Sequence, residues 1–123
     1  MITTVTLNPS FDLTLEVDDL VRGGVSRADR ERLEAAGKGV NVSRALAAHH
    51  VPTRAVAALD PAAAPRFKEL LDADLVLQVI PVAGVLRTNV TIVQPAGVVT
   101  KVHGPGPRYT PEAARALLAN AAD

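Results

Sequence analysis

The order of apolar and polar residues predicts buried strands that alternate with amphipathic helices. Residues 2–7 are rich in threonine, valine and isoleucine and stop at Asn8-Pro9-Ser10. Proline cannot continue a strand ladder, so a strand that ends abruptly is predicted there. Residues 53–59, apolar from Ala55 onward, have the length typical of a buried parallel strand, and residues 75–82 predict a further strand.

Two other regions have the pattern of strands with one wet face. From Asp12 to Val17 polar and apolar residues alternate, which is the period of a strand exposed on one side. Such strands belong to antiparallel sheets or sheet edges. Residues 87–93 and 98–103 predict a hairpin around the turn at 95–97.

Several segments have helical patterns. Residues 26–37 combine good helix propensity with charge pairs at helical spacing, although a single leucine gives them no apolar stripe. Asp60-Pro61 and Thr110-Pro111 each place a capping residue before proline, a good helix start. The predicted inward faces are Val42, Ala45, Leu46 and His49 after Gly39, then Phe67, Leu70 and Leu71, then Ala114, Leu117, Leu118 and Ala121.

The resulting order of strand, helix, strand, helix, strand predicts a parallel α/β core. The half-wet strands interrupt this order and predict a small β-sheet of different character. A sheet of three core strands is thin, and no further strand follows the last helix. We therefore expect the complete fold to be larger than these 123 residues.

Composition narrows the class of function. Hydrophobic residues make up 48% of the chain, as in globular proteins, whereas aromatic residues make up only 2% and offer little for base stacking. Thirteen basic residues balance thirteen acidic ones, so no net field favours nucleic acid. The chain has no cysteine, no apolar run of about 18 residues and no signal-peptide pattern. The expected location is the cytoplasm, with no nucleic-acid or membrane partner.

The stretch AAGKGVNVS, residues 35–43, places two glycines around Lys38 before a predicted helix. Its order matches neither a P-loop nor the Gly-x-Gly-x-x-Gly fingerprint. Gly37 and Gly39 could let N–H groups at the helix N-terminus point at a ligand. Lys38 would then add charge for an anion, and Asn41 could bind a hydroxyl. Alternatively, the glycines only allow the turn and Lys38 lies in solvent; spacing alone leaves both interpretations open.

Three further groups are candidates for ligand binding. Asp12, at the mouth left by the first strand, could accept hydrogen bonds from two neighbouring sugar hydroxyls, or it could be a turn-forming aspartate. Arg87 and Asn89 lie two apart on a predicted strand, so they share a face that suits phosphate. Lys101 could reach the same anion if the hairpin register allows it. The alternative for these cations is a solvated edge strand.

No metal site is predicted from these residues. The adjacent His49 and His50 point about 100° apart on a helix, so they cannot form a ligand pair. His103 has no second ligand of a suitable kind nearby. Neither a Ser-His-Asp arrangement nor paired carboxylates stand out, so no catalytic residue is predicted within the chain.

Four stretches together carry a family resemblance. TVTLNPSFD, AAGKGVNVSRAL, GVLRTNV and HGPGP occur in the order and spacing found in the N-terminal part of the ribokinase-like, PfkB-type carbohydrate kinases. The likeness is strongest to the branch that phosphorylates sugar phosphates, 1-phosphofructokinase and tagatose-6-phosphate kinase. It extends over essentially all 123 residues. Each motif is weak alone, whereas the four at matching spacing are specific.

The resemblance implies a role for each candidate residue. It implies that Asp12 binds sugar hydroxyls and that the Gly-Lys-Gly-x-Asn element lines the sugar site. It implies that the Arg-x-Asn element binds the phosphate already on the substrate, with help from a basic residue before the Gly-Pro-Gly turn. The substrate-binding residues so implied are Asp12, Gly37, Lys38, Gly39, Asn41, Arg87, Asn89 and Lys101.

The resemblance also implies the fold and the activity. The expected fold is α/β and ribokinase-like: a partial parallel, Rossmann-like sheet with flanking helices and a small β-sheet lid. Residues 1–123 would form the N-terminal part of a kinase domain, with lid strands over about 12–34 and 86–103. The implied reaction is ATP-dependent phosphorylation of a ketohexose phosphate such as fructose 1-phosphate, fructose 6-phosphate or tagatose 6-phosphate.

The family's catalytic aspartate and most of its ATP site belong to a C-terminal half that these residues lack. ATP and Mg²⁺ would therefore be bound mainly outside this chain, and the chain alone is expected to be inactive. The alternative is an inactive sugar-phosphate-binding or dimerisation module from a truncated kinase. A homodimer through the β lid is a further expectation.

Three positions depart from the family pattern. Ala36 stands where a first glycine is usual, which would strain the backbone only at positive φ. Leu86 replaces a usual threonine before Arg87, and Leu59-Asp60-Pro61 replaces a Gly-Gly turn. These departures bear on which sugar is bound.

Overall fold

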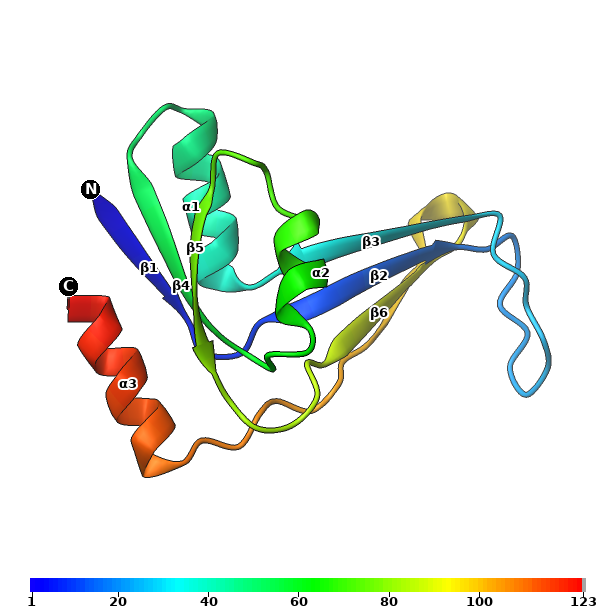
Figure 1. Ribbon diagram of the computed structural model, residues 1–123. Coiled ribbons are helices and arrows are strands. Elements are labelled where there is room, and N and C mark those ends of the chain that lie inside the picture. Colours follow the sequence, from blue (N-terminus) through cyan, green and yellow to red (C-terminus); the bar gives the residue numbers. More distant parts are fainter. Residues whose placement is uncertain (123) are drawn as a thin grey trace.

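The computed structural model describes residues 1–122, which form two β-sheets and three α-helices (Figure 1). In chain order the elements are β1 (Ile2–Thr6), β2 (Ser10–Glu16), β3 (Arg30–Ala36), α1 (Lys38–Ala48), β4 (Thr53–Leu59), α2 (Ala64–Glu69), β5 (Val76–Pro81), β6 (Thr88–Val93), the 3₁₀ turn η1 (Pro95–Gly97), β7 (Val99–Val102) and α3 (Pro111–Ala122).

A three-stranded parallel sheet, the core sheet, has the order β1-β4-β5. The apolar strand β4 lies at its centre, and successive side chains point to opposite faces. Leu59 packs with Phe67 of α2 in one apolar cluster, whereas Val56 packs with Leu117 of α3 in the other. The predicted parallel α/β core with flanking helices is therefore confirmed.

The start of α1 lies against the end of β1. A Cβ atom on Gly39 would lie 2.6 Å from Thr6 Oγ1 and 2.8 Å from the carbonyl oxygen of Val5. One on Gly37 would lie 2.5 Å from Thr6 Cγ2. The N–H of Val40 donates to Thr6 Oγ1 at 3.0 Å, which satisfies an amide at the helix N-terminus. Glycine is therefore required here for the close approach of two backbones.

The inward face of α1 differs from the predicted one. Val42 is 51% exposed, and Ala45 and His49 are also exposed. Ser43 is buried instead, and its hydroxyl is hydrogen-bonded to Thr4 Oγ1 at 2.7 Å and to Thr53 Oγ1 at 2.9 Å. The prediction failed because a polar residue with partners in the sheet faces inward, which apolar periodicity cannot detect.

The two later helices follow the prediction in part. The N–H of Ala62 donates to Asp60 Oδ1 at 3.1 Å, but a turn follows and α2 begins only at Ala64. Phe67, Leu70 and Leu71 pack inward as predicted. Thr110 caps α3 by accepting the N–H of Ala113 at 3.1 Å. Leu118 was predicted to be buried and is exposed, whereas Leu117, Ala113 and Ala116 pack on the core sheet.

A second sheet, the outer sheet, has the order β3-β2-β6-β7. β2 is antiparallel to β3 and parallel to β6, and β6 and β7 form the predicted antiparallel hairpin. The predicted helix over residues 26–37 is wrong, because residues 30–36 form β3. Leu33 pairs with Leu13 in register, so strand pairing overrides the local helix propensity.

The outer sheet has one polar and one apolar face. Cross-strand partners and alternate residues share a face. The register places Phe11, Leu13, Leu15, Leu33, Ala35, Val90, Ile92 and Val102 on one, mainly apolar, face, together with Glu31, Thr88 and Thr100. The other, mainly polar, face carries Ser10, Asp12, Thr14, Glu16, Arg30, Arg32, Glu34, Asn89, Thr91 and Lys101, together with Ala36, Val93 and Val99.

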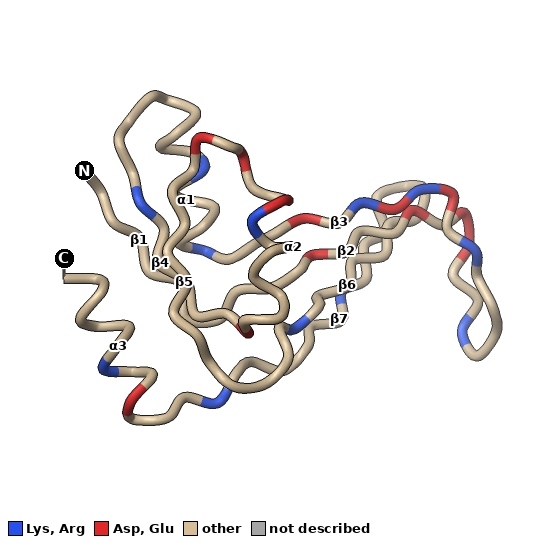
Figure 2. The backbone as a smooth tube through the Cα atoms, in the orientation of Figure 1, with Lys and Arg blue, Asp and Glu red and all other residues tan. Residues whose placement is uncertain are grey.

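Charged residues are sparse in the core sheet and frequent around the outer sheet (Figure 2). Arg54 on β4 is the charged residue of the core strands; it donates to Gln78 Oε1 at 3.1 Å and to the carbonyl oxygen of Asn120 at 2.9 Å. These bonds attach the last turn of α3 to the sheet. No helix within residues 1–122 is both long and apolar enough to cross a membrane.

The adjacent leucines of α3 provide a test of its packing. Leu117 is 4% exposed and Leu118 is 70% exposed. Leu117→Ala should lower the free energy of unfolding by about 2–5 kcal/mol, because it leaves a cavity against the core sheet. The matched control Leu118→Ala should change it by no more than about 0.5 kcal/mol. Urea denaturation monitored by circular dichroism measures both, and equal losses would contradict this packing.

Gly39→Ala tests the close approach of α1 to β1. Replacing a helical glycine by alanine ordinarily stabilises a protein by about 1 kcal/mol. Here the added Cβ would collide with Thr6 and Val5, so we expect a loss of about 1–3 kcal/mol in the free energy of unfolding. Val42→Ala, an exposed change on the same helix, is the control in the same denaturation experiment. A more stable Gly39→Ala protein would show that the two backbones are not in contact.

Candidate functional site

A pocket of about 540 Å³ lies where the core sheet meets the outer sheet. It is at the carboxyl end of β1, the end of a parallel strand where α/β proteins commonly bind ligands. The structure brings all the predicted site residues to this pocket except Lys101. Its lining residues are Val5, Thr6, Leu7, Asn8, Ser10, Asp12, Ala36, Gly37, Lys38, Gly39, Asn41, Arg87 and Asn89.

Asp12 lies in a hydrogen-bonded group on the polar face of the outer sheet. Ser10 Oγ donates to Asp12 Oδ1 at 2.7 Å. Asn89 pairs with Asp12 in register, and its Nδ2 lies 3.3 Å from both Ser10 Oγ and Asp12 Oδ1. Asn89 Oδ1 accepts the N–H of Gly104 at 3.2 Å. Both ends of the Asn89 amide are therefore engaged within the protein.

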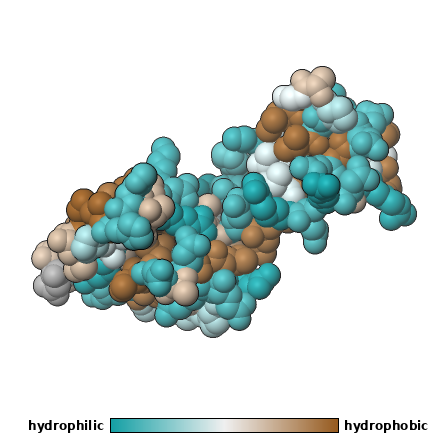
Figure 3. Space-filling view, turned by 90° about the horizontal axis from the view of Figure 1, so that it is seen from above, coloured by the Kyte–Doolittle hydropathy of each residue, from teal (hydrophilic) through white to brown (hydrophobic). Residues whose placement is uncertain are grey.

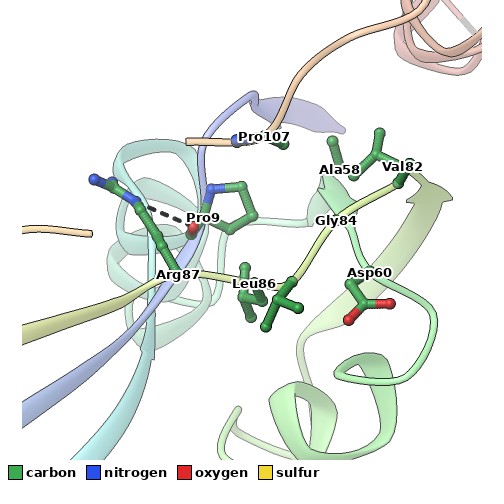
Figure 4. A pocket seen from close by; sticks show the side chains of 10 residues that line it. Pro9, Ala58, Asp60, Val82, Gly84, Leu86, Arg87 and Pro107 are labelled. Atoms are coloured by element: carbon green, nitrogen blue, oxygen red, sulfur yellow. Dashed lines mark hydrogen bonds between the residues drawn. The ribbon is translucent and has the colours of Figure 1, made fainter. Parts of the chain in front are cut away.

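Arg87 immediately precedes β6 and is held by the connection between β1 and β2. Its Nη2 donates to the carbonyl oxygen of Asn8 at 3.0 Å, and its Nε lies 3.4 Å from that of Pro9. Figure 4 shows the guanidinium pointing away from a small cavity bordered by Ala58 and Asp60. That cavity holds about 10 Å³, roughly the space of one water, so it is no ligand site.

The turn between β3 and α1 forms another wall of the pocket. Lys38 and Asn41 are exposed, and the N–H of Asn41 donates to the carbonyl oxygen of Gly37 at 2.8 Å. Gly37 and Gly39 pack against β1, so these glycines have a structural role. The same packing brings Lys38 to the pocket, so a structural role and a ligand-binding role are compatible.

Ala36 ends β3 opposite Ser10 and is buried. It is not among the residues with positive φ, so the alanine causes no backbone strain. Leu86 packs against the first apolar cluster. These two departures from the family pattern therefore have ordinary structural explanations.

The loop that leads from β7 to α3 packs against residues that line the pocket. The hydroxyl of Tyr109 donates to the carbonyl oxygen of Leu7, and burial raises the pKa of this tyrosine. A Cβ on Gly106 would lie 3.0 Å from the amide nitrogen of Asn8. Together with the hydrogen bond from Gly104 to Asn89, these contacts fix the loop along the β1–β2 connection, which also holds Arg87.

Lys101 lies outside the pocket lining. It pairs with Thr91 on β6, so it shares the polar face with Asn89 but lies one cross-strand pair further out. Residues two apart on a strand are separated by about 7 Å. Its predicted contact with the anion remains a prediction.

Sequence reasoning missed two pocket residues that organise the others. Ser10 was assigned only to a turn, although a residue two positions before Asp12 on the same strand must share its face. That signal was available. Thr6 gave no comparable signal, because its role depends on how closely α1 approaches β1.

The donor set of the pocket fits an anion with hydroxyl groups better than Mg²⁺. Magnesium favours several oxygen ligands, whereas Asp12 is the carboxylate that lines this pocket. Within residues 1–122 no group of three histidine, cysteine or acidic side chains could hold a metal ion.

Comparison with known proteins finds sugar-phosphate kinases among the relatives. The chain is 36% identical over 119 residues to 1-phosphofructokinase of Bacillus subtilis, covering 96% of this chain and 39% of that protein. The structure of phosphofructokinase-2 from Escherichia coli in complex with fructose-6-phosphate superposes with a TM-score of 0.87 at 25% identity, covering 97% of this chain and 40% of that one. A tetrameric inhibited form of that enzyme is also similar.

Arabidopsis thaliana ribokinase shares the fold, with a TM-score of 0.64 at 23% identity, covering 86% of this chain and 36% of that one. No family model matches the chain. The chain spans about two fifths of the length of the first relatives it matches. Motifs, fold and relatives agree: over nearly its whole length the chain is similar to part of the ribokinase-like, PfkB-type carbohydrate kinases.

Proposed function

We propose that this chain supplies the sugar-phosphate-binding side of an ATP-dependent kinase acting on a ketohexose phosphate. Fructose 1-phosphate, fructose 6-phosphate and tagatose 6-phosphate are the candidate substrates. The observation that carries the proposal is the single pocket in which a carboxylate, Asp12, and two cations, Lys38 and Arg87, line the same space.

The chemistry of each group suits one part of such a ligand. The guanidinium of Arg87 offers a planar set of donors for phosphate, and Lys38 adds a point charge. Asp12 and Asn41 offer acceptors for sugar hydroxyls. A sugar phosphate could therefore be recognised at both ends within one pocket, which orients its acceptor hydroxyl.

The relatives support this assignment. Phosphofructokinase-2 was solved with fructose-6-phosphate, and the Bacillus subtilis relative is a 1-phosphofructokinase. Both act on phosphorylated fructose by name, and both are about two and a half times longer than this chain. The choice between the candidate sugars stays open in the proposal.

The transfer step itself is proposed to need residues beyond this chain. Phosphoryl transfer depends mainly on positioning and on charge stabilisation around the nucleotide. We propose that residues beyond this chain bind ATP and Mg²⁺ and supply the catalytic base. The reaction would occur in the cytoplasm. The 123-residue chain alone should bind sugar phosphate without consuming ATP, which a coupled ATPase assay would measure.

Arg87→Ala tests the proposed phosphate contact. Loss of a charge-assisted contact should weaken sugar-phosphate binding by about 1.5–3 kcal/mol, roughly 10- to 150-fold. Isothermal titration calorimetry with the three candidate sugar phosphates measures the change and ranks the ligands. Arg87→Lys should lose less, because it keeps the charge without the planar fork.

The matched control is Arg108→Ala, an exposed cation on the neighbouring loop that does not line the pocket. Its affinity should equal that of the unchanged protein. If Arg87→Ala binds all three sugar phosphates as tightly as the control, Arg87 is not the phosphate ligand and the proposed site is wrong.

The apolar face of the outer sheet favours a second role, association with another copy of the chain. Leu13 pairs in register with Leu33 and Val90, and Leu15 pairs with Ile92, so these side chains form a continuous apolar surface, with the exposed Glu31 beside Leu15 at its edge. All of them remain partly exposed. Apolar side chains gather on the lobe that this sheet forms, at the right of Figure 3. Large exposed apolar patches commonly mark interfaces.

We propose a dimer through this face, in keeping with the tetrameric form of the Escherichia coli enzyme. In the alternative to the kinase assignment, sugar-phosphate binding and this association would be the whole function of an inactive module. A phosphoryl-transfer assay on the protein, including any residues that follow Asp123, distinguishes the two roles. ATP-dependent product favours the kinase, whereas binding without product favours the module.

Leu15→Glu tests the dimer. A carboxylate on the apolar face would be desolvated at the interface, so the protein should sediment as a monomer in analytical ultracentrifugation. Thr14→Glu places the same charge on the polar face and should leave the dimer intact. A monomer before any substitution, or equal behaviour of the two variants, would refute the interface.

A further inference from the structure

We infer that Ser10 is a positioning residue that holds Asp12 in one orientation, so that a single carboxylate oxygen, Oδ2, is presented to the ligand. The inference deepens the proposed function and rests on it for the identity of the ligand. It refines the expectation from sequence that Asp12 accepts hydrogen bonds from two neighbouring sugar hydroxyls, because it assigns them to one oxygen.

The geometry around Asp12 is asymmetric. Oδ1 accepts the Ser10 hydroxyl at 2.7 Å and lies 3.3 Å from the Asn89 amide nitrogen. Oδ2 has no hydrogen-bond partner among the side chains and backbone of residues 1–122. Asp12 lines the pocket, so the oxygen left over is the one available to a bound molecule.

Ser10 is itself fixed. It is 2% exposed, pairs with Ala36 in the register of β2 and β3, and lies 3.3 Å from Asn89 Nδ2. A buried hydroxyl without a partner is unfavourable, so this one retains its bond to Asp12. Asn89 is anchored in turn by the N–H of Gly104. Ser10, Asn89 and the loop at Gly104 therefore form a rigid support behind the carboxylate.

The support matters because the terminal torsion of an aspartate is soft. Rotation about χ2 has a broad, roughly two-fold profile, so an unsupported carboxylate samples many directions. With Oδ1 held twice, Oδ2 keeps one direction, and the ordering required on binding is reduced. A single fixed oxygen accepts only from hydroxyls that reach its one position, which selects among sugars by where those hydroxyls lie.

A double-mutant cycle tests the inference. Ser10→Ala should weaken binding of fructose 6-phosphate by about tenfold, whereas binding of inorganic phosphate should be unchanged, because Arg87 and Lys38 bind that group. In an Asp12→Ala background, Ser10→Ala should cause no further loss of affinity. An equal loss in both backgrounds would mean that Ser10 acts only on the fold, and the inference would be wrong.

Ser43→Ala is the matched control. Ser43 is also buried and its hydroxyl has two partners, but it lies between α1 and the core sheet, outside the pocket lining. It should lower stability and leave affinity unchanged. If Ser10→Ala does not fold, Ser10→Cys keeps nearly the same shape with a weak donor and should show a smaller loss of the same kind.

A ligand-free measurement separates this inference from the proposed function. The ¹³C chemical shift of the Asp12 carboxyl carbon should change in Ser10→Ala and stay constant in Ser43→Ala. No change in Ser10→Ala overturns the inference even if sugar phosphates bind. If the shift changes but the unchanged protein binds none of the three sugar phosphates, the support exists and the proposed function is wrong.

Discussion

The contact between the end of β1 and the start of α1 is the constraint on which the site depends. Thr6 fills the space that side chains at Gly37 and Gly39 would occupy, and its hydroxyl accepts an amide of the helix. Any larger residue at these positions would move α1 outward and with it Lys38 and Asn41. The same contact therefore determines both the packing of α1 on the core sheet and the shape of the pocket.

The outer sheet provides the other half of the site through strand pairing. Because β2 and β6 are parallel and in register, Asp12 and Asn89 lie side by side although they are far apart in sequence. The backbone of Phe11 also donates to the carbonyl oxygen of Arg87 at 3.0 Å, which continues the pairing to the start of β6. Register thus determines which polar groups meet.

Predictions from the sequence succeeded where the apolar pattern determines which residues are buried. They failed where strand pairing or hydrogen bonds between polar side chains determine the structure. Residues 53–59 form the buried parallel strand that their pattern predicts, and Phe67 and Leu71 face inward as predicted. Residues 30–36 have helix propensity but pair with β2, and Ser43 is buried through hydroxyl partners. Of the residues assigned from motifs, all but Lys101 line the pocket, but the support by Ser10 and Thr6 depends on three-dimensional contacts.

The parallel pairing of β2 with β6 affects the order in which the protein folds. The partners lie 77 residues apart in the case of Asp12 and Asn89, and a chain must close a long loop before they meet. The core pairing of β1 with β4 closes a shorter loop, so we expect the pocket to be completed late in folding. During synthesis, ligand binding would then report that residues up to at least Asn89 have emerged and docked.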